Sequence, residues 1–310
     1  MKLWMTALLS AALLAPAHAG NDAAAAVTIQ AGRDASVAAP TRGALYRVRH
    51  EGTVSYLFGT IHVGTPAHMV LDAEVERALM QSRRLVLELD VRDDAPVHRA
   101  LEKHGLYSPG TGIDRHLDAD TLRLLKDALE RFGLAYEAVQ GMKPWLVANL
   151  LQGLELDRNG FRRHYGAEYN LIAFAPGHAV LELETAEYQM ALFDGMSAAA
   201  QEEYLRETLQ DLQAGRALRK ARELIDAWAS ADRDTLARLW QESLTEGSRT
   251  AEFTHRVLLD ERNPLMADKV EILLKERESS FVAVGLLHLI GKNGLPALLR
   301  QRGYSVERVY

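Results

Sequence analysis

Short apolar runs near both ends of the chain alternate with longer segments of helical spacing. Residues 45–49 and 53–58 form two strand-like runs around a turn that contains Gly52, which predicts a β-hairpin. Residues 71–82 have helical spacing, and residues 85–89 form a continuous apolar run typical of a buried strand. From about residue 94 to 278 the pattern is helical, with one short strand at residues 179–183. A strand at 281–284, a helix at 295–301 and a strand at 304–309 follow.

This order of elements predicts the architecture. Strands at both ends of the sequence with helices between them indicate a sheet assembled from distant segments. Residues 44–310 contain no fixed-period repeat and no linker-like stretch. We therefore predict one α/β domain over residues 44–310, with a central sheet, flanking helices and a large helical insertion.

The amino-terminal segment has a different character. A positively charged start, an apolar run over residues 3–14 and an Ala-x-Ala pattern ending at Ala19 predict a signal peptide over residues 1–19. An apolar run of about a dozen residues is too short for a membrane span, which needs about 20. Residues 20–43 are rich in Ala, Gly, Asp and Thr without a sustained period, so we expect a flexible leader. The mature chain is expected to be exported to the periplasm, without a membrane span.

Composition narrows the chemistry. The 310 residues include 36 Lys and Arg against 42 Asp and Glu, a net charge of −6, so we expect no nucleic-acid partner. The absence of Cys excludes disulfides, thiolate metal sites and cysteine nucleophiles, so any metal must be held by His, Asp or Glu. The chain has no G-x-S-x-G, H-E-x-x-H, G-x-x-x-x-G-K or G-x-G-x-x-G string, which disfavours serine hydrolases and nucleotide enzymes.

Two G-x-x-H strings stand out, Gly59 to His62 and Gly285 to His288. Each directly follows a predicted strand and precedes another glycine. In open α/β sheets ligands bind outside the carboxyl ends of the strands, so both histidines are expected to project into one crevice. The alternative is that these histidines are hydrogen-bonded structural residues at sheet corners.

Carboxylates also lie at the ends of predicted strands, as the two histidines do. Glu88 lies inside or at the end of the buried run at 85–89, and Glu182 and Glu184 lie at the end of the short strand at 179–183 and point to one face. An acid in an apolar run needs a cation, a metal or a hydrogen-bond network. With two histidines these carboxylates could form the ligand set that Zn²⁺, Mn²⁺ or Fe²⁺ accepts, and the metal would activate a water for hydrolysis. The alternative for Glu88 is a buried ion pair with an Arg such as Arg262.

Two further motifs have local structural explanations. Asn263 before Pro264 fits a helix start, with Asn as the N-cap and Pro at the first helical position. Lys143-Pro144-Trp145 fits helix initiation followed by a core aromatic residue, and we assign it no chemistry.

Taken together and in order, these motifs resemble the TraB/PrgY/GumN/TIKI family, most of all its exported bacterial TraB (GumN-type) branch. The resemblance spans residues 44–310. It rests on the following strings: Leu-Phe-Gly-Thr-Ile-His at 57–62, Leu-Glu-Leu around Glu88, Lys-Pro-Trp at 143–145, Leu-Glu-Thr at 183–185 followed by Glu187 and Gln189, Asp-Glu-Arg-Asn at 260–263, and Val-Gly-Leu-Leu-His-Leu at 284–289 with Gly291 and Gly294.

The resemblance implies a TIKI-like α/β fold related to the erythromycin esterase and haem-binding ChaN-like group. Animal TIKI members are described as metal-dependent proteases that trim secreted signalling proteins. Carried over to this sequence, His62 and His288 become metal ligands or catalytic histidines, and Glu88 and Glu184 become ligand or base. Arg262 and Asn263 would orient the substrate or a carboxylate. The metal would be Mn²⁺, Co²⁺ or Zn²⁺, and the substrate a peptide or protein.

One departure concerns the central helix. Where many relatives place Gly-x-Asp, this chain has Gly166-Ala167-Glu168, so the carboxylate is one methylene longer and its reach to the site is open. The resemblance leaves two functions open. The first is an exported metal-dependent hydrolase, in the form of a TIKI-like peptidase. The second is a protein that sequesters a peptide or haem without turnover, as PrgY-type relatives that block peptide pheromones suggest. The simplest alternative is that the G-x-x-H strings only shape the corners of the sheet.

Overall fold

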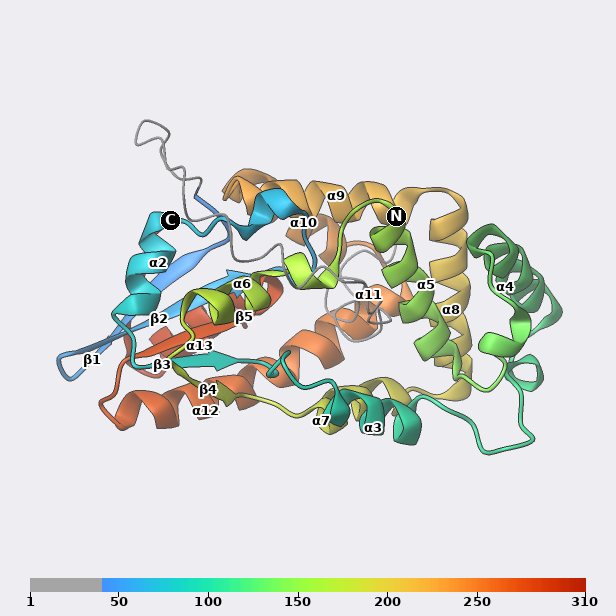
Figure 1. Ribbon diagram of the computed structural model, residues 1–310, viewed down its shortest axis with the longest axis horizontal. Helices are drawn as coiled ribbons and strands as arrows, with labels where there is room; N and C mark the ends of the chain where they lie inside the picture. The colour runs from blue at the N-terminus through green and yellow to red at the C-terminus, as the bar shows by residue number, and fades with distance from the viewer. Residues whose placement is uncertain (1–40) are drawn as a thin grey trace.

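A computed structural model describes residues 41–310 of the protein. The predicted signal peptide and all but the last three residues of the predicted leader lie outside these described residues. Among residues 41–310, every helix is too short or too polar to cross a bilayer. The described chain is an α/β structure, as the hydropathy pattern predicts, with a sheet at one end and a helical region at the other (Figure 1).

The sheet has six strands among the described residues, in the order β4-β3-β5-β2-β1-β6. Strands β4, β3, β5 and β2 are parallel to one another, and β1 pairs antiparallel with both β2 and β6. Their bounds are β1 Leu45–His50, β2 Thr53–Thr60, β3 Arg84–Leu87, β4 Ala179–Glu182, β5 Ser280–Gly285 and β6 Ser305–Arg308.

The predicted hairpin is confirmed. Strands β1 and β2 pair from Leu45↔Phe58 to His50↔Thr53 around a two-residue turn. Both turn residues have positive φ, 45° at Glu51 and 84° at Gly52. This is the backbone twist that two-residue hairpin loops require, and Gly52 adopts it without a steric penalty.

Strand β5 comes from the end of the chain yet lies between β2 and β3, where it pairs in parallel with both. All six of its residues are buried, which explains its continuous apolar sequence. The prediction that distant segments assemble the sheet is therefore confirmed.

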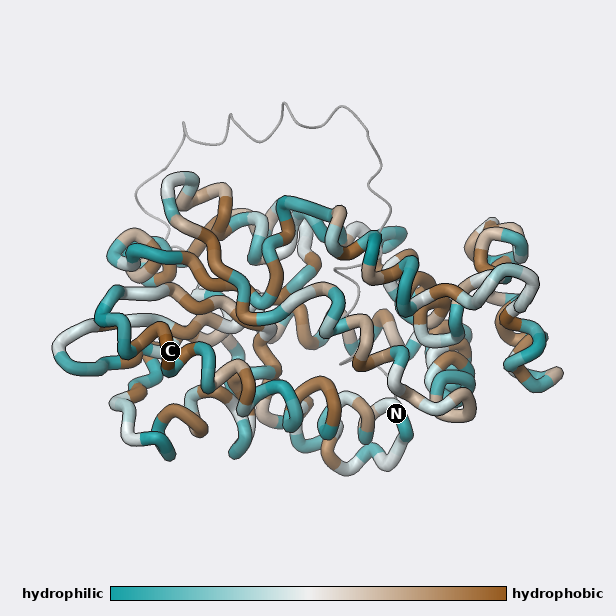
Figure 2. Tube along the Cα trace, turned by 90° about the horizontal axis from the view of Figure 1, so that it is seen from below, coloured by the Kyte–Doolittle hydropathy of each residue, from teal (hydrophilic) through white to brown (hydrophobic). Residues whose placement is uncertain are grey.

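Helices cover the sheet and form the helical region. They are α2 Ala73–Met80, α3 Ala95–His104, α4 Ala119–Phe132, α5 Pro144–Arg158, α6 Ala167–Phe174, α7 Ala186–Asp194, α8 Ala198–Gln213, α9 Arg216–Ala229, α10 Arg233–Leu244, α11 Arg249–Phe253, α12 Arg262–Lys275 and α13 Leu295–Gln301. One apolar core joins the sheet to α2, α6, α9, α12 and α13, and a second lies among α3, α4, α5, α7, α8 and α11. Hydrophobic stretches of the chain run through the interior, and hydrophilic ones occupy turns and outer helices (Figure 2).

The start of α12 differs from the prediction. Its N-cap is Glu261, so Asn263 is the second residue inside the helix and not the cap. Pro264 follows in the first turn, where its missing N–H has no intrahelical partner to lose. The Asn263 side chain is therefore free of capping and turns to another partner, described below.

Candidate functional site

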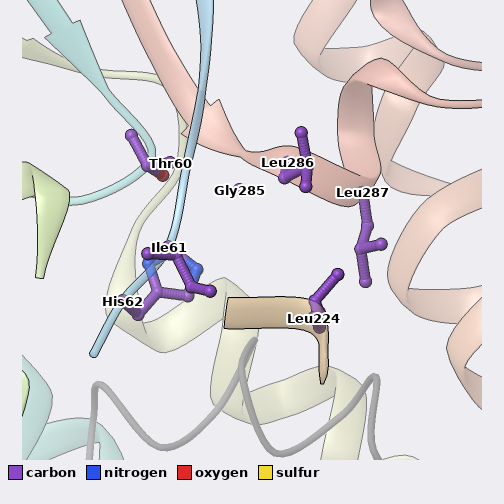
Figure 3. Close-up of a pocket in the computed structure, with 7 residues that line it drawn as sticks. All are labelled: Thr60, Ile61, His62, Leu224, Gly285, Leu286 and Leu287. Carbon is purple, nitrogen blue, oxygen red and sulfur yellow. The ribbon is translucent and has the colours of Figure 1, made fainter. Parts of the chain in front are cut away.

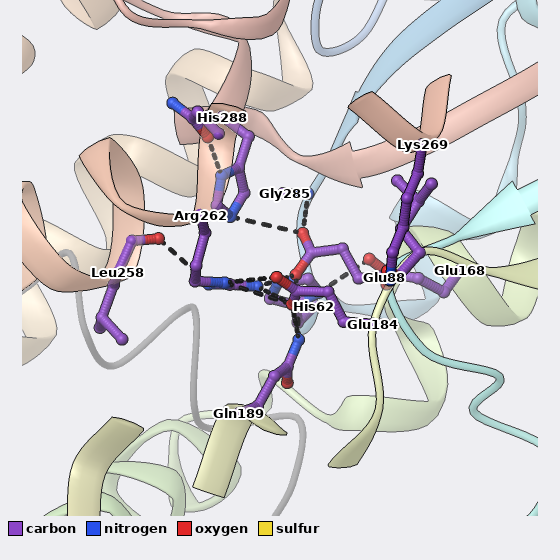
Figure 4. A network of polar contacts seen from close by, with 12 residues as sticks. His62, Glu88, Glu168, Glu184, Gln189, Leu258, Arg262, Lys269, Gly285 and His288 are labelled. Carbon is purple, nitrogen blue, oxygen red and sulfur yellow. Dashed lines mark hydrogen bonds and ion pairs between the residues drawn. The ribbon is translucent and has the colours of Figure 1, made fainter. Parts of the chain in front are cut away.

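Four parallel strands deliver four of the predicted side chains to one edge of the sheet. His62 follows β2, Glu88 follows β3, Glu184 follows β4 and His288 follows β5, each within three residues of its strand end. The carboxyl ends of parallel strands lie at the same edge, which brings these side chains together (Figure 4).

Arg262 lies at the centre of the cluster. Its Nη2 donates to Glu88 Oε2 at 2.8 Å and to Glu184 Oε2 at 2.6 Å. Its Nε donates to both oxygens of Glu184, at 3.0 and 3.2 Å. The guanidinium is buried, so one cation joins two buried carboxylates (Figure 4). For Glu88, the alternative of an ion pair with Arg262 is therefore what the structure shows.

Two further donors complete the bonding of these carboxylates. The backbone N–H of Gly285 donates to Glu88 Oε1 at 2.6 Å. Gln189, on α7, donates from Nε2 to Glu184 Oε2 at 2.8 Å and to Glu88 Oε2 at 3.4 Å. The carboxylates are thus held in place from the strand ends, from α7 and from α12.

His62 is fixed by Glu168. Its Nδ1 lies 2.7 Å from Glu168 Oε1; Glu168 is buried, and the His62 side chain is 12% exposed. The backbone N–H of Ala167 donates to Ile61 O at 2.9 Å, which ties the start of α6 to the end of β2. The longer glutamate side chain therefore reaches the site. Because the carboxylate can only accept a hydrogen bond, His62 Nδ1 carries the proton, and Nε2 has a lone pair that can bind a metal or accept a hydrogen bond.

His288 is fixed by Asn263. Its Nδ1 lies 2.5 Å from Asn263 Oδ1, and Asn263 Nδ2 donates to the carbonyl of Asn293 at 2.8 Å. That second bond orients the amide, so Oδ1 faces the imidazole and His288 Nδ1 is the donor. His288 Nε2 then carries a lone pair; it is buried without a hydrogen-bond partner, 3.7 Å from Glu88 Oε1.

The charges follow from burial and neighbours. Burial raises the pKa of Glu88, but the Arg262 guanidinium and the Gly285 hydrogen bond outweigh it and lower that pKa well below its usual range. Burial lowers the pKa of His288 to about 3, so its imidazole is neutral. Burial also lowers the pKa of His62, but Glu168 outweighs it and raises that pKa overall. The site therefore combines ionised Glu88 with two imidazoles of different basicity.

The chain is similar to known proteins over most of its length. The family model of the TraB/PrgY/gumN family matches residues 44–308, nearly the whole described chain. The chain belongs to the TraB/PrgY/gumN family. It is 25% identical over 254 residues to the uncharacterized protein YbaP of Shigella flexneri, covering 79% of this chain and 88% of the relative. It is also 25% identical over 253 residues to YbaP of Escherichia coli strain K12, covering 79% and 87%. No solved structure matches it.

The side chains of this TraB/PrgY/gumN member fit a metal ion in part. His62 Nε2 and His288 Nε2 are suitable donors, since each ring is oriented through a hydrogen bond on Nδ1 as in metal-binding histidines. Glu88 and Glu184 are engaged by Arg262. Within residues 41–310, no three His, Asp or Glu side chains are arranged to surround an ion. The histidines fit, and the glutamates as arranged do not.

A small pocket lies beside His62 in this family member. It is lined by Thr60, Ile61, His62, Leu224, Gly285, Leu286 and Leu287 (Figure 3). Its free space is about 20 Å³ for the centre of a water molecule, and one water needs about 10–15 Å³. A water-sized group therefore fits next to the imidazole.

The sequence predicted that Glu182 and Glu184 point to the same face of the strand, but in the structure they point to different surroundings. Glu182 is exposed and accepts from the backbone N–H of Asp90 at 2.6 Å, whereas Glu184 is buried against Arg262. The chain leaves β4 at Glu182, so strand alternation no longer applies to Glu184. Gln189 and Asn293 carry contacts to the site that sequence reasoning gave no role, although Gln189 belongs to the string behind the family resemblance.

Proposed function

We propose that the protein is a metal-dependent hydrolase that cleaves peptide bonds at the cluster formed by His62, Glu88, Glu184, Arg262 and His288. The observation that carries this proposal is the pair of oriented imidazoles on either side of Glu88, each with Nδ1 hydrogen-bonded and Nε2 available. Membership in the TraB/PrgY/gumN family is consistent with it.

His62 would bind the metal through Nε2, the ring nitrogen that Glu168 does not engage. Glu168 would keep the proton on Nδ1 and strengthen Nε2 as a donor. Glu88, which is ionised, would accept the proton from the attacking water. The pocket beside His62 has room for that water.

A divalent metal held by His62 and His288 would polarise the attacking water or the substrate carbonyl. Arg262 would keep Glu88 and Glu184 ionised and fixed, so the field at the site is set before substrate arrives. Asn263 would hold His288 in the tautomer that leaves Nε2 unprotonated.

Elemental analysis of the purified mature protein, reconstituted separately with Mn²⁺, Co²⁺ and Zn²⁺, tests the metal. We expect stoichiometric metal in the wild type and loss of it in His62→Ala and His288→Ala. His255→Ala is the matched control, since His255 donates to or accepts from Ser243 away from the site. Absence of metal from the wild type after each reconstitution would refute the metal-dependent mechanism.

Hydrolysis of a fluorogenic peptide mixture tests the reaction itself. We expect turnover by the wild type and by His255→Ala, and a loss of about 10²-fold or more in His62→Ala and His288→Ala. Saturable peptide binding without turnover by the metal-loaded wild type would instead favour sequestration of a peptide, the second function considered. Arg262, which already neutralises both glutamates, is the feature that favours that alternative.

We also propose that the protein acts after export to the periplasm. The support is the amino-terminal sequence pattern that ends at Ala19. Fractionation of cells that express the full chain, with amino-terminal sequencing of the recovered protein, tests this. A mature chain that starts at Gly20 is expected, and an intact Met1 in the cytoplasmic fraction would contradict it.

A further inference from the structure

The open edge of the sheet lies directly beside the candidate site. Strand β4 is the outermost strand on the side of α12 and pairs only with β3 (Figure 1). Two residues beyond its last residue stands Glu184, which is part of the site. An extended peptide that paired with β4 at this edge would therefore have one end close to Arg262 and His62.

The unpaired backbone groups of this edge can be identified. The N–H of Leu183 donates to Leu87 O at 2.8 Å, and Leu87 is the register partner of Glu182. Successive residues of a strand point their backbone groups in opposite directions, so Val180 and Glu182 direct theirs away from β3. Among the described residues neither has a backbone partner on that side. Val180 and Glu182 are two positions apart, which is the spacing at which an added strand forms its hydrogen bonds.

Helix α12 supplies an apolar wall beside this edge. Leu265, Lys269 and Ile272 lie on one stripe of the helix, four and three residues apart. Lys269 Nζ donates to the carbonyl of Leu183 just past β4, which places the stripe next to the edge (Figure 4). Leu265 is 49% exposed and Ile272 is 60% exposed, two of the largest exposures of apolar side chains in the described chain.

We propose that an extended segment of the peptide substrate binds as an additional strand along β4, with apolar side chains against Leu265 and Ile272. This inference rests on the proposed peptidase function. Unpaired strand edges recognise another extended backbone through main-chain hydrogen bonds, while alternate side chains enter neighbouring pockets. The occupant is thus a polypeptide in extended conformation with apolar residues at alternate positions, and not a folded domain or a small molecule.

The binding test uses capped, fluorescein-labelled decapeptides that alternate apolar and polar residues, measured by fluorescence anisotropy. His62→Ala serves as the background, so that the peptides are not consumed. Val180→Pro removes one outward N–H, which an edge strand tolerates, and Val180→Ala retains it. We expect the dissociation constant to rise about fivefold in Val180→Pro and to change little in Val180→Ala.

The apolar wall has its own matched pair. Leu265→Ser with Ile272→Ser is expected to weaken binding about tenfold, and Met80→Ser, also 60% exposed but on α2, should bind as the parent does. These variants keep the test valid even if Val180→Pro fails to fold. Decapeptides that are N-methylated at alternate backbone nitrogens should bind much more weakly, because they cannot complete the strand pairing.

Amide hydrogen exchange identifies the bound edge. Peptide should protect the amides of Val180 and Glu182. The inference is overturned if Val180→Pro and the Leu265→Ser/Ile272→Ser variant both bind the peptide as tightly as the His62→Ala parent does. It is also overturned if the parent shows no saturable binding up to about 1 mM peptide, a concentration that detects even weak affinity. A concentration-dependent dimer that protects the same amides without peptide also overturns it, since a second copy then occupies the edge.

The two proposals fail separately. Hydrolysis that is lost in His62→Ala but unaffected by Val180→Pro and the wall variant would retain the peptidase and reject edge binding. Edge binding without hydrolysis by the metal-loaded wild type would retain edge binding and reject the peptidase.

Discussion

Nδ1 of His288 lies 2.5 Å from Oδ1 of Asn263, two residues into α12, and this bond determines which nitrogen of the buried imidazole carries the proton. The amide cannot turn over without losing its own bond to the Asn293 carbonyl. A residue that the sequence suggested as a helix cap is thus the orienting partner of a site histidine.

Asn263→Ala should lower the free energy of unfolding by about 1–3 kcal/mol, because it leaves a buried N–H of His288 and the Asn293 carbonyl unsatisfied. Urea unfolding followed by tryptophan fluorescence measures this. Gln241→Ala, on the exposed face of α10, should change stability by less than about 0.5 kcal/mol. Equal stability of the two variants would contradict the buried bond.

Arg262→Met should be more damaging. It leaves Glu88 and Glu184 buried without their cation, a loss of about 3–5 kcal/mol in urea unfolding. Adding Glu88→Gln and Glu184→Gln to the same chain should recover part of that loss, since the uncompensated charges disappear. Arg249→Met, which breaks an exposed pair with Glu252, should unfold like the wild type. An unchanged midpoint in Arg262→Met would show that the buried pairs are not formed.

His288 predicts a loss of stability in acid. Burial lowers its pKa in the folded protein to about 3, whereas the unfolded chain takes up a proton near pH 6.5. The unfolded state therefore binds more protons below that pH, and stability should fall by roughly 1 kcal/mol per pH unit between about pH 6.5 and 3 from this residue. Unfolding of the wild type and His288→Gln between pH 7.5 and 4 checks this. The variant should have the shallower slope, and parallel curves would argue against a neutral buried His288.

The pH dependence of stability that His62 contributes is opposite to that of His288, because Glu168 raises the pKa of His62. The raised pKa of His62 gives stability that is complete below about pH 6.5 and is lost as pH rises through the folded value. Glu168, whose pKa is lowered because His62 outweighs burial, gives stability that is lost as pH falls through its own folded value. The pair should stabilise most between about pH 4.5 and 6.5.

Glu168→Gln checks this pair directly. Without the Glu168 carboxylate the main effect that opposes burial is lost, so the pKa of His62 should fall, as measured by NMR titration of its ring protons. Glu130→Gln, exposed on α4, is the charge-matched control and should leave that titration unchanged. On the proposed function, the acidic limb of the pH–rate profile should move to lower pH in Glu168→Gln alone.

Gly166→Ala tests the junction between α6 and β2. A Cβ at this position would meet the backbone O of His62 at 2.6 Å and the O of Arg163 at 2.9 Å, and backbone cannot move aside cheaply. We expect a loss of about 1–3 kcal/mol of stability and a weaker His62–Glu168 bond. Gly153→Ala in α5, where nothing lies within 4 Å, should leave stability unchanged or raise it by up to about 1 kcal/mol. Thermal unfolding of both variants measures the difference, and equal stability of Gly166→Ala and Gly153→Ala would contradict the close contact at Gly166.

The sequence predicted the strand ends well because their signals are local. A continuous apolar run followed by glycine or a carboxylate marks both the buried strand and its exit, and His62, Glu88 and His288 all follow such runs. The order of strands in the sheet is set by long-range packing, and nothing in the β5 sequence itself states that it lies between β2 and β3.

The partners of these residues were harder to predict. Arg262 was recognised as a possible partner of Glu88 but not as a cation shared with Glu184, because neither strand sequence states that β3 and β4 pair and so end beside each other. Asn263 and Pro264 gave a strong capping signal, but the π-helical segment Thr254–Asp260 leads directly into α12, so no helix begins at Asn263. Glu168 required the geometry of α6 before its reach to His62 could be decided.

The insertion of β5 between β2 and β3 also sets the order in which the molecule can be built. While the chain emerges from the ribosome, β2 and β3 exist for almost two hundred residues before the strand that joins them is made. Pairings between such distant segments form slowly, because a long loop must close before its contacts are made. Any chain that stops before Ser280 lacks both β5 and the second imidazole, so a truncated or nascent product of that length has no assembled site.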